Sequence, residues 1–140
     1  MDWEECCKKR IVKEVNPDLD MAKALEKSSK NKLESADKLE ISAVTASSKL
    51  SLAYDSLREL LEALALKKGY KVYNHECYAA FIKEVLKDSE KGDEFDDVRK
   101  ERNNVNYYGK EISVEEAEIV IFMIRKVRSF IEKLLETNPP

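Results

Sequence analysis

A long apolar stripe near the middle of the chain constrains the fold more than any other feature. Between about Ser42 and Lys68, apolar side chains recur at the i, i+3, i+4, i+7 spacing of a single helix face. They are Leu50, Ala53, Tyr54, Leu57, Leu60, Leu61 and Leu64. Gly69 follows where a helix commonly ends with a left-handed residue. Because such a stripe must be buried against other elements, the segment is predicted to be the central helix of a helical domain.

The N-terminal part of the chain predicts a short piece followed by a long helix. Asn16 is a suitable N-cap and Pro17 suits a first helical turn, so a helix is expected from 17 to about 39. Residues 1–16 are expected to form an arm or a short helix. Their basic cluster at 8–10 is typical of a solvated face.

Two further helices are predicted between the central helix and the last one. Asn74 is expected to cap a helix over about 74–87, and the polar residues 87–92 are expected to be a connection. The next helix is expected over about 93–107 and ends at Gly109, whose conformational freedom suits a helix C-terminus.

A capping box predicts the start of the last helix. Ser113 is the expected N-cap and Glu116 occupies the third helical position, from which the helix should continue to about Leu135. Residues 138–140 are expected to be a frayed tail. The fold prediction is therefore all-α: an antiparallel bundle of four long helices within 17–137, plus the short N-terminal helix or arm. No segment predicts a strand.

Composition restricts where such a protein acts and what it binds. The 140 residues suffice for one domain, and 38% of them are charged, with both signs interspersed. A net charge of −3 does not favour broad attraction to nucleic acids or membranes, so any such binding must be local. The N-terminus lacks a signal-peptide pattern and no apolar run is long enough to cross a bilayer, so a cytoplasmic protein without membrane contact is expected.

The cysteines and the single histidine argue against a metal site. Cys6 and Cys7 are adjacent and Cys77 is remote, which gives neither a disulfide framework nor the spacing of metal ligands. All three are expected to be reduced thiols. His75 is followed by glutamate but lacks the second histidine of a zinc-protease motif, and the chain has no phosphate-cradling glycine loop. We therefore expect no metal and no cofactor.

Arg102 occupies a position where an apolar residue is expected. The apolar positions of its helix are Phe95, Val98 and Val105, and the spacing 95, 98, 102, 105 makes Arg102 the missing member of that stripe. A buried guanidinium is costly unless it is paired, because it cannot lose its charge. Arg102 is thus expected to form an ion pair, with Asp55 or Glu59, or to face a ligand or a subunit boundary.

Polar side chains flank Arg102 on the same helix. Arg99, Asn103 and Asn106 form a ridge of planar donors and amides that suit phosphate groups or base edges. His75 lies at the first turn of the preceding helix and on its apolar face, where it is expected to be neutral. Two interpretations of His75 stay open: a satisfied core or capping residue, or a member of a site with Arg102.

Four stretches, in order and at plausible spacing, resemble HEPN-domain proteins. They are "AYDSLRELLEALALKKGY" (53–70), "NHECYAAFI" (74–82), "VRKERNNVNYYGK" (98–110) and "ISVEEAEIVIFMI" (112–124). The resemblance implies a compact helical bundle, commonly dimeric and often encoded beside a minimal nucleotidyltransferase. It also implies a polar motif near the dimer interface. In the ribonuclease members that motif is an arginine, a polar residue, a short spacer and a histidine, and it cuts RNA without a metal.

This chain departs from that motif at one position. Arg102 and Asn103 match the arginine and the polar residue, but Tyr107 stands where the histidine falls when four residues separate it from the arginine. An unperturbed tyrosine titrates near 10, which makes it a poor base at neutral pH. The leading hypothesis is therefore a non-catalytic module that binds a nucleotide or RNA. Its expected binding residues are Arg99, Arg102, Asn103, Asn106, Tyr107 and Tyr108.

Two alternatives and the partners follow from the same resemblance. One alternative is a metal-independent ribonuclease toxin, in which Arg102 acts with Tyr107 or His75. The other is a purely structural interaction protein. The expected partners are a second copy of the chain, a minimal nucleotidyltransferase as in toxin–antitoxin pairs, and a nucleotide or RNA ligand.

Overall fold

A computed structural model describes residues 1–137, apart from the side chain of Tyr107. The tail predicted for 138–140 lies outside the described residues. The elements are α1 (Trp3–Lys8), β1 (Val12–Glu14), α2 (Leu19–Lys38), α3 (Ala46–Lys67), β2 (Tyr70–Val72), α4 (Glu76–Ala80), the π-helix η1 (Phe81–Val85), α5 (Ser89–Tyr107) and α6 (Val114–Thr137). The described chain is mostly helical, with one two-stranded sheet.

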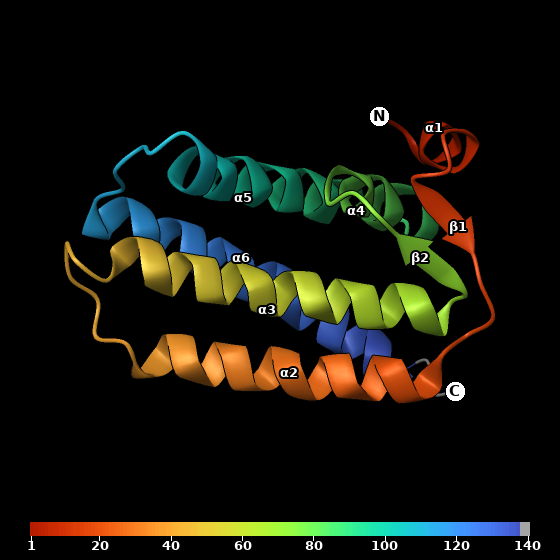
Figure 1. The fold of residues 1–140 in the computed structure, drawn as a ribbon, viewed down its shortest axis with the longest axis horizontal. Helices are drawn as coiled ribbons and strands as arrows, with labels where there is room; N and C mark the ends of the chain where they lie inside the picture. Colours follow the sequence, from red (N-terminus) through yellow and green to blue (C-terminus); the bar gives the residue numbers. More distant parts are fainter. Residues whose placement is uncertain (138–140) are drawn as a thin grey trace.

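Helix α3 lies at the centre of the molecule. Figure 1 shows α2 beside α3 and running in the opposite direction, α5 on the other side of α3, and α6 crossing it obliquely. Helix α3 packs against all three of these helices and against β2. The prediction of a central helix in this segment is confirmed. Its first half packs closely because small residues such as Ala46 and Ala53 are fully buried.

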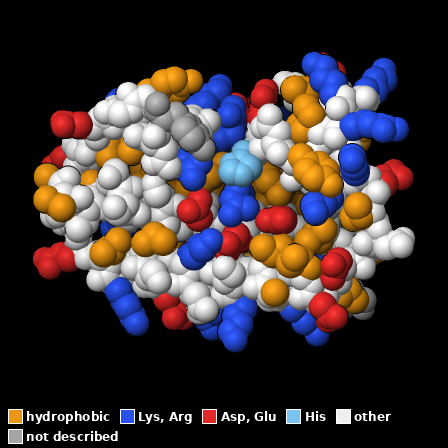
Figure 2. Space-filling view, viewed as in Figure 1, with side chains coloured by type: hydrophobic (Ala, Val, Ile, Leu, Met, Phe, Trp, Pro, Cys, Tyr) orange, Lys and Arg blue, Asp and Glu red, His pale blue; other side chains and the backbone are white. Residues whose placement is uncertain are grey.

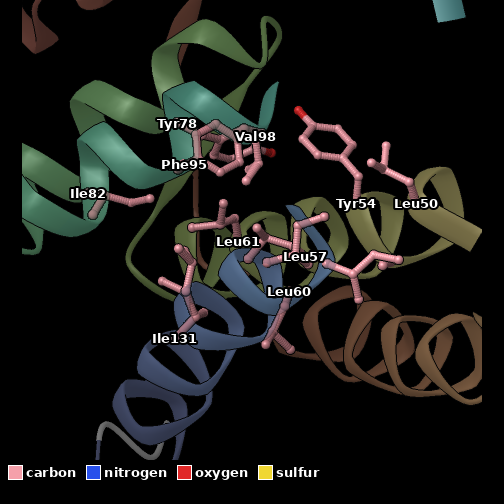
Figure 3. Packing of buried hydrophobic residues seen from close by; sticks show 14 of the residues in the cluster. Leu50, Tyr54, Leu57, Leu60, Leu61, Tyr78, Ile82, Phe95, Val98 and Ile131 are labelled. Atoms are coloured by element: carbon pink, nitrogen blue, oxygen red, sulfur yellow. The ribbon is translucent and has the colours of Figure 1, made fainter. Parts of the chain in front are cut away.

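The core forms where α3, α4, α5 and α6 meet. Figure 3 shows Tyr54, Leu57 and Leu61 of α3 facing the buried side chains of the neighbouring helices. Those neighbours include Tyr78, Ile82, Phe95, Val98 and Ile131. Fully burying an aliphatic or aromatic side chain stabilises a fold by about 1.5–3 kcal/mol, so this cluster supplies the main driving force for folding.

Two predicted helix starts are displaced by local side-chain hydrogen bonds. Helix α3 begins at Ala46, not near Ser42, because the Thr45 hydroxyl donates to the Glu40 carbonyl (2.6 Å) and accepts from the Ser42 amide (2.9 Å). Such bonds offer the backbone an alternative to the helix. Helix α2 begins at Leu19 with Asp18 as its N-cap, so Asn16 is not the cap.

Helix α5 begins at Ser89, four residues before the expected start. Asp88 is the N-cap and accepts a hydrogen bond from the Lys91 amide at 3.0 Å, so the predicted connection over 87–92 is shorter than expected. Gly92 lies inside this helix. A Cβ atom there would collide with the Lys83 side chain, so the glycine permits α5 to approach η1 closely.

Other helix ends follow the sequence signals. The Glu116 amide donates to Ser113 Oγ at 3.1 Å, which confirms the capping box at the start of α6. Gly69 and Gly109 have φ angles of +88° and +64°, as expected for residues that follow helices α3 and α5. The Asn74 side chain accepts from the Glu76 amide at 2.9 Å and so caps the first turn of α4.

The prediction that no strand would form is wrong. Strands β1 and β2 pair antiparallel, with Val12 opposite Val72 and Lys13 opposite Lys71. Each strand has only three residues, and an isolated hairpin of this size is marginal in water. The ribbon is stabilised by tertiary packing, because Val12 is buried against Cys6, Cys77 and Ala80. Local sequence patterns carry little information about such long-range support.

The prediction of three reduced thiols is also wrong. Cys6 of α1 and Cys77 of α4 form a disulfide, with their Cα atoms 6.1 Å apart, and Cys7 is exposed and free. The bridge joins residues 71 positions apart in the sequence, so no local spacing could reveal it. It fastens α1 to the helix that begins beside His75.

The disulfide yields a first prediction. A bridge that closes a loop of this length stabilises a fold by about 2–4 kcal/mol, mainly by restricting the unfolded chain. We expect one titratable thiol in the denatured, unreduced protein and three after reduction, together with a clear fall in melting temperature on reduction. Cys7→Ser is the control, since it should leave the melting temperature unchanged; three thiols without reductant would contradict the bridge.

Candidate functional site

Tyr54 connects the two residues that the sequence left unconnected. Its ring is fully buried on α3, and its hydroxyl lies 3.2 Å from Nδ1 of His75, at the start of α4. The guanidinium carbon of Arg102, on α5, lies 5.1 Å from the centre of the same ring. This is a cation–π distance. Figure 2 shows the single histidine at the surface, with Lys or Arg and Asp or Glu side chains beside it.

Arg102 occupies the predicted slot in the apolar stripe of α5. Its side chain is only 14% exposed, and its Nη2 atom lies 3.4 Å from Oδ1 of Asp55. One of the two ion pairs expected from the sequence is thereby confirmed. Glu59, the other expected partner, forms its ion pair with Lys32 of α2. Charge-assisted bonds are usually about 2.7–2.9 Å long, so Arg102 is held loosely by Asp55.

Two more arginines extend the cluster. Arg99 donates from Nε and Nη2 to Oδ1 of Asp96, at 3.0 and 2.8 Å, and its side chain is 15% exposed. Arg58 of α3 pairs with Glu62 at 3.2 Å. Arg58 was missed in the sequence analysis. The available signal was its position four residues after Tyr54, which places both on one helix face.

Burial and nearby arginines keep His75 neutral. Burial, together with the positive charges of Arg58, Arg102 and Arg99, lowers the pKa of His75 to about 4, while Asp55 acts in the opposite direction. The imidazole is therefore neutral at pH 7. Each of the three arginines also has a carboxylate partner: Asp55 for Arg102, Glu62 for Arg58 and Asp96 for Arg99. We call Arg58, Arg99, Arg102 and His75 the arginine cluster.

The remaining predicted residues lie further along α5. Asn103 is half-buried beside Arg102. Asn106, about one turn further on, is exposed and accepts a hydrogen bond from the Ser51 hydroxyl at 3.1 Å. Tyr108 is 79% exposed beyond the helix end, and the side chain of Tyr107 lies outside the described part of the structure. The structure thus brings His75, Arg99 and Arg102 together and leaves Asn106 and Tyr108 at the edge.

The described residues contain neither a group of metal ligands nor a membrane-spanning helix. Within residues 1–137, no three His, Cys, Asp or Glu side chains are grouped as metal ligands. The helices of that same region include none with the length and apolar character needed to span a bilayer. Comparison with protein-family models, with curated protein sequences and with solved structures finds no match to this chain.

His75 yields a second prediction. Its folded pKa lies below the ordinary value of 6.5, so between about pH 4 and 6.5 the unfolded chain binds more protons than the folded one. The stabilisation is complete above pH 6.5 and is lost as pH falls towards 4. We expect His75 to lower the free energy of unfolding by on the order of 1–2 kcal/mol between pH 7 and pH 5.

Urea unfolding at both pH values measures this effect. The control is His75→Asn, whose side chain can still hydrogen-bond Tyr54 but does not titrate. Equal losses of stability on acidification in the wild type and in His75→Asn would contradict a depressed histidine pKa.

Proposed function

We propose that this chain is a HEPN-like helical module that binds phosphate groups of a nucleotide or RNA at the arginine cluster. The observation that carries the proposal is the grouping of three arginines near His75, one of them packed on the Tyr54 ring that contacts the imidazole, in a chain of net negative charge. Arginine suits this role because its planar donors match phosphate oxygens and its charge persists at all relevant pH values.

The packing of Arg102 on an aromatic ring is compatible with a ligand role. Its ion pair with Asp55 is 3.4 Å long, and its guanidinium lies against the Tyr54 ring. Such an arginine can shift towards a phosphate without losing its packing on the ring. Arg58 and Arg99 keep their carboxylate partners and provide the surrounding positive field.

The neutral histidine fits the same role. An uncharged imidazole can donate from its ring N–H to a phosphate or a base edge, and it adds no charge that varies near neutral pH. His75 is half-buried, so part of its ring is accessible. In this proposal it supplies a directional hydrogen bond, while the arginines supply the charge.

The finer architecture and the partners belong to the same proposal. We propose that α2, α3, α5 and α6 form a HEPN-like antiparallel bundle that acts in the cytoplasm as a dimer. A minimal nucleotidyltransferase is the proposed protein partner, in a pair of toxin–antitoxin type. The resemblance of the quoted sequence stretches supports these points, and the helical content is compatible with them.

The third prediction tests phosphate binding. Arg102→Gln keeps most of the stem that covers Tyr54 but removes the charge, and it should weaken binding of ATP and of a short single-stranded RNA by about tenfold or more, since a charged hydrogen bond contributes about 1.5–3 kcal/mol. Isothermal titration calorimetry and fluorescence anisotropy measure the two affinities. Arg58→Gln should weaken the binding of both ligands by a smaller factor.

Arg125→Gln is the matched control. Arg125 of α6 forms an exposed ion pair with Asp37, so its replacement removes an equal charge elsewhere. It should leave both affinities within about twofold of the wild type, as expected for a distant surface charge. If the wild-type protein binds neither ATP, nor other nucleotides, nor RNA, the purely structural alternative is favoured.

A second candidate function is a metal-independent ribonuclease. The observation that favours it is the connection of His75 to Arg102 through Tyr54, because a histidine beside an arginine can provide proton transfer and phosphate stabilisation. The low pKa of His75 argues against it. With a pKa of about 4, roughly one part in a thousand of the imidazole is protonated at pH 7, so His75 is a poor general acid.

The fourth prediction separates the two functions. We expect labelled transfer RNA and messenger RNA to stay intact when incubated with the purified protein in EDTA at neutral pH, because the low pKa of His75 leaves almost none of the imidazole protonated there. Gel analysis over several hours is the measurement. Cleavage that is lost in both Arg102→Gln and His75→Ala would establish the enzyme in place of the binding module.

A further inference from the structure

The β1–β2 ribbon presents a second positive surface. Lys13 and Lys71 lie directly opposite each other in the antiparallel register. Neither forms an ion pair among the described residues, and their amino groups lie 5.4 and 5.5 Å from the centre of the Tyr73 ring. Tyr73 is 56% exposed, and its amide donates to the Ile11 carbonyl at 2.8 Å, which continues the pairing of the ribbon.

This cross-strand pair lowers the stability of the ribbon. Like charges directly opposite on neighbouring strands repel, whereas most residue types fit an exposed strand position without that penalty. Each of the two strands is only three residues long, so the repulsion falls on an element with few hydrogen bonds of its own. A bound anion would remove the repulsion, because it would neutralise both lysines at once.

Arg10 introduces a second local cost beside the ribbon. It follows the end of α1 with a φ of +58°, in the left-handed region. The Arg10 amide donates to the Cys7 carbonyl at 3.1 Å and the Ile11 amide donates to the Cys6 carbonyl at 3.0 Å. These two bonds define a helix-ending motif whose left-handed position is usually glycine, since a side chain there is strained.

The strained residue Arg10 and the repelling residue Lys13 lie in the same region of the surface. Arg10 and Lys13 line a surface hollow of about 500 Å³, together with Cys7, Val12 and Glu14. Figure 2 shows Lys and Arg side chains gathered at the end of the molecule where α1 and β1 lie in Figure 1. Strained or repulsive positions that persist in a fold often mark a functional surface, and here both retain cations.

Tyr73 and the position of the ribbon identify the ligand class. An exposed aromatic ring between cations is the arrangement that binds single-stranded nucleic acid, in which bases stack on the ring and cations contact the backbone. The flexible lysine stems allow the amino groups to move from the ring to phosphates. Tyr73 is two residues before His75, so their Cα atoms are at most about 7.6 Å apart and the ribbon adjoins the arginine cluster.

We propose that the ribbon surface, made of Arg10, Lys13, Lys71 and Tyr73, binds a single-stranded RNA that extends from the arginine cluster. The proposal rests on the proposed phosphate-binding role of that cluster for the position of the strand. It assigns a polynucleotide, not a free mononucleotide, as the ligand. Tyr73 is the stacking platform, and the three cations contact successive backbone phosphates.

The fifth prediction uses two variants that should gain stability and lose binding. Lys71→Glu replaces the cross-strand repulsion with an attraction to Lys13, and Arg10→Gly removes the left-handed strain. Each should raise the melting temperature by about 2–4 °C. Each should also weaken the binding of a fluorescein-labelled RNA of about 12 nucleotides by about fivefold to tenfold. The slope of log affinity against log salt concentration should decrease in magnitude by about 0.7 or more.

Three comparisons make the result specific. Lys23→Glu changes the same charge on the exposed surface of α2 and should leave RNA affinity within about twofold. Tyr73→Ala should weaken RNA binding by about tenfold, as expected for loss of one stacked base, but should not alter binding of polyphosphate. ATP affinity, which reports on the arginine cluster, should be unchanged in all ribbon variants.

The outcomes separate this proposal from the proposed function. Higher melting temperatures with unchanged RNA affinity would overturn the ribbon proposal, even if Arg102→Gln still abolishes ATP binding. RNA binding that depends on Lys71 but not on Arg102 would retain the ribbon and reject the arginine cluster. Equal effects of Lys71→Glu on RNA and on polyphosphate, with no effect of Tyr73→Ala, would show a surface for polyanions in general and overturn the assignment to a single strand.

Discussion

The burial of the Tyr54 ring is the interaction on which the core and the candidate site both depend. The ring is fully buried and stacks on Phe95, with a centroid distance of 6.1 Å, so it fixes the position of α5 against α3. Its hydroxyl reaches His75, and its face lies beneath Arg102. An aromatic side chain with a polar tip can hold an apolar contact and a polar site in register. The geometry of the arginine cluster is thus set by the packing of the core.

A second buried arginine shows what a structural role looks like in this protein. Arg128 of α6 donates to the hydroxyls of Ser56 and Ser29 at 2.8 and 3.1 Å and also pairs with Glu132, and its side chain is 7% exposed. Those contacts satisfy the guanidinium within the interface of α2, α3 and α6. Arg102 pairs with Asp55 at 3.4 Å and packs against the Tyr54 ring. The two guanidinium groups thus have different surroundings: Arg128 joins three helices through hydroxyl groups, and Arg102 lies against an aromatic ring.

Sequence patterns predicted the features that depend on neighbours in the chain. The central position and the C-terminal end of α3, the capping box of α6 and the unusual position of Arg102 follow from helical spacing and from end signals within a few residues. The disulfide, the β1–β2 ribbon and the role of Arg58 were missed, because each depends on segments that meet only in the folded molecule. The early start of α5 was missed because Gly92 suggested a connection, whereas its lack of a side chain serves helix packing.

The N-terminal segment contributes more to the site than its position in the sequence suggests. Trp3 of α1 packs edge-on against Tyr70 of β2 at 5.2 Å, and the Cys6–Cys77 bridge fastens α1 to α4. His75 lies between these two attachments, three residues after β2 ends at Val72 and two residues before Cys77. Because both attachments restrain the short segment that carries His75, loosening either would release the imidazole from Tyr54. The N-terminal segment therefore supports the position of His75, in addition to carrying Arg10 and Lys13 of the ribbon surface.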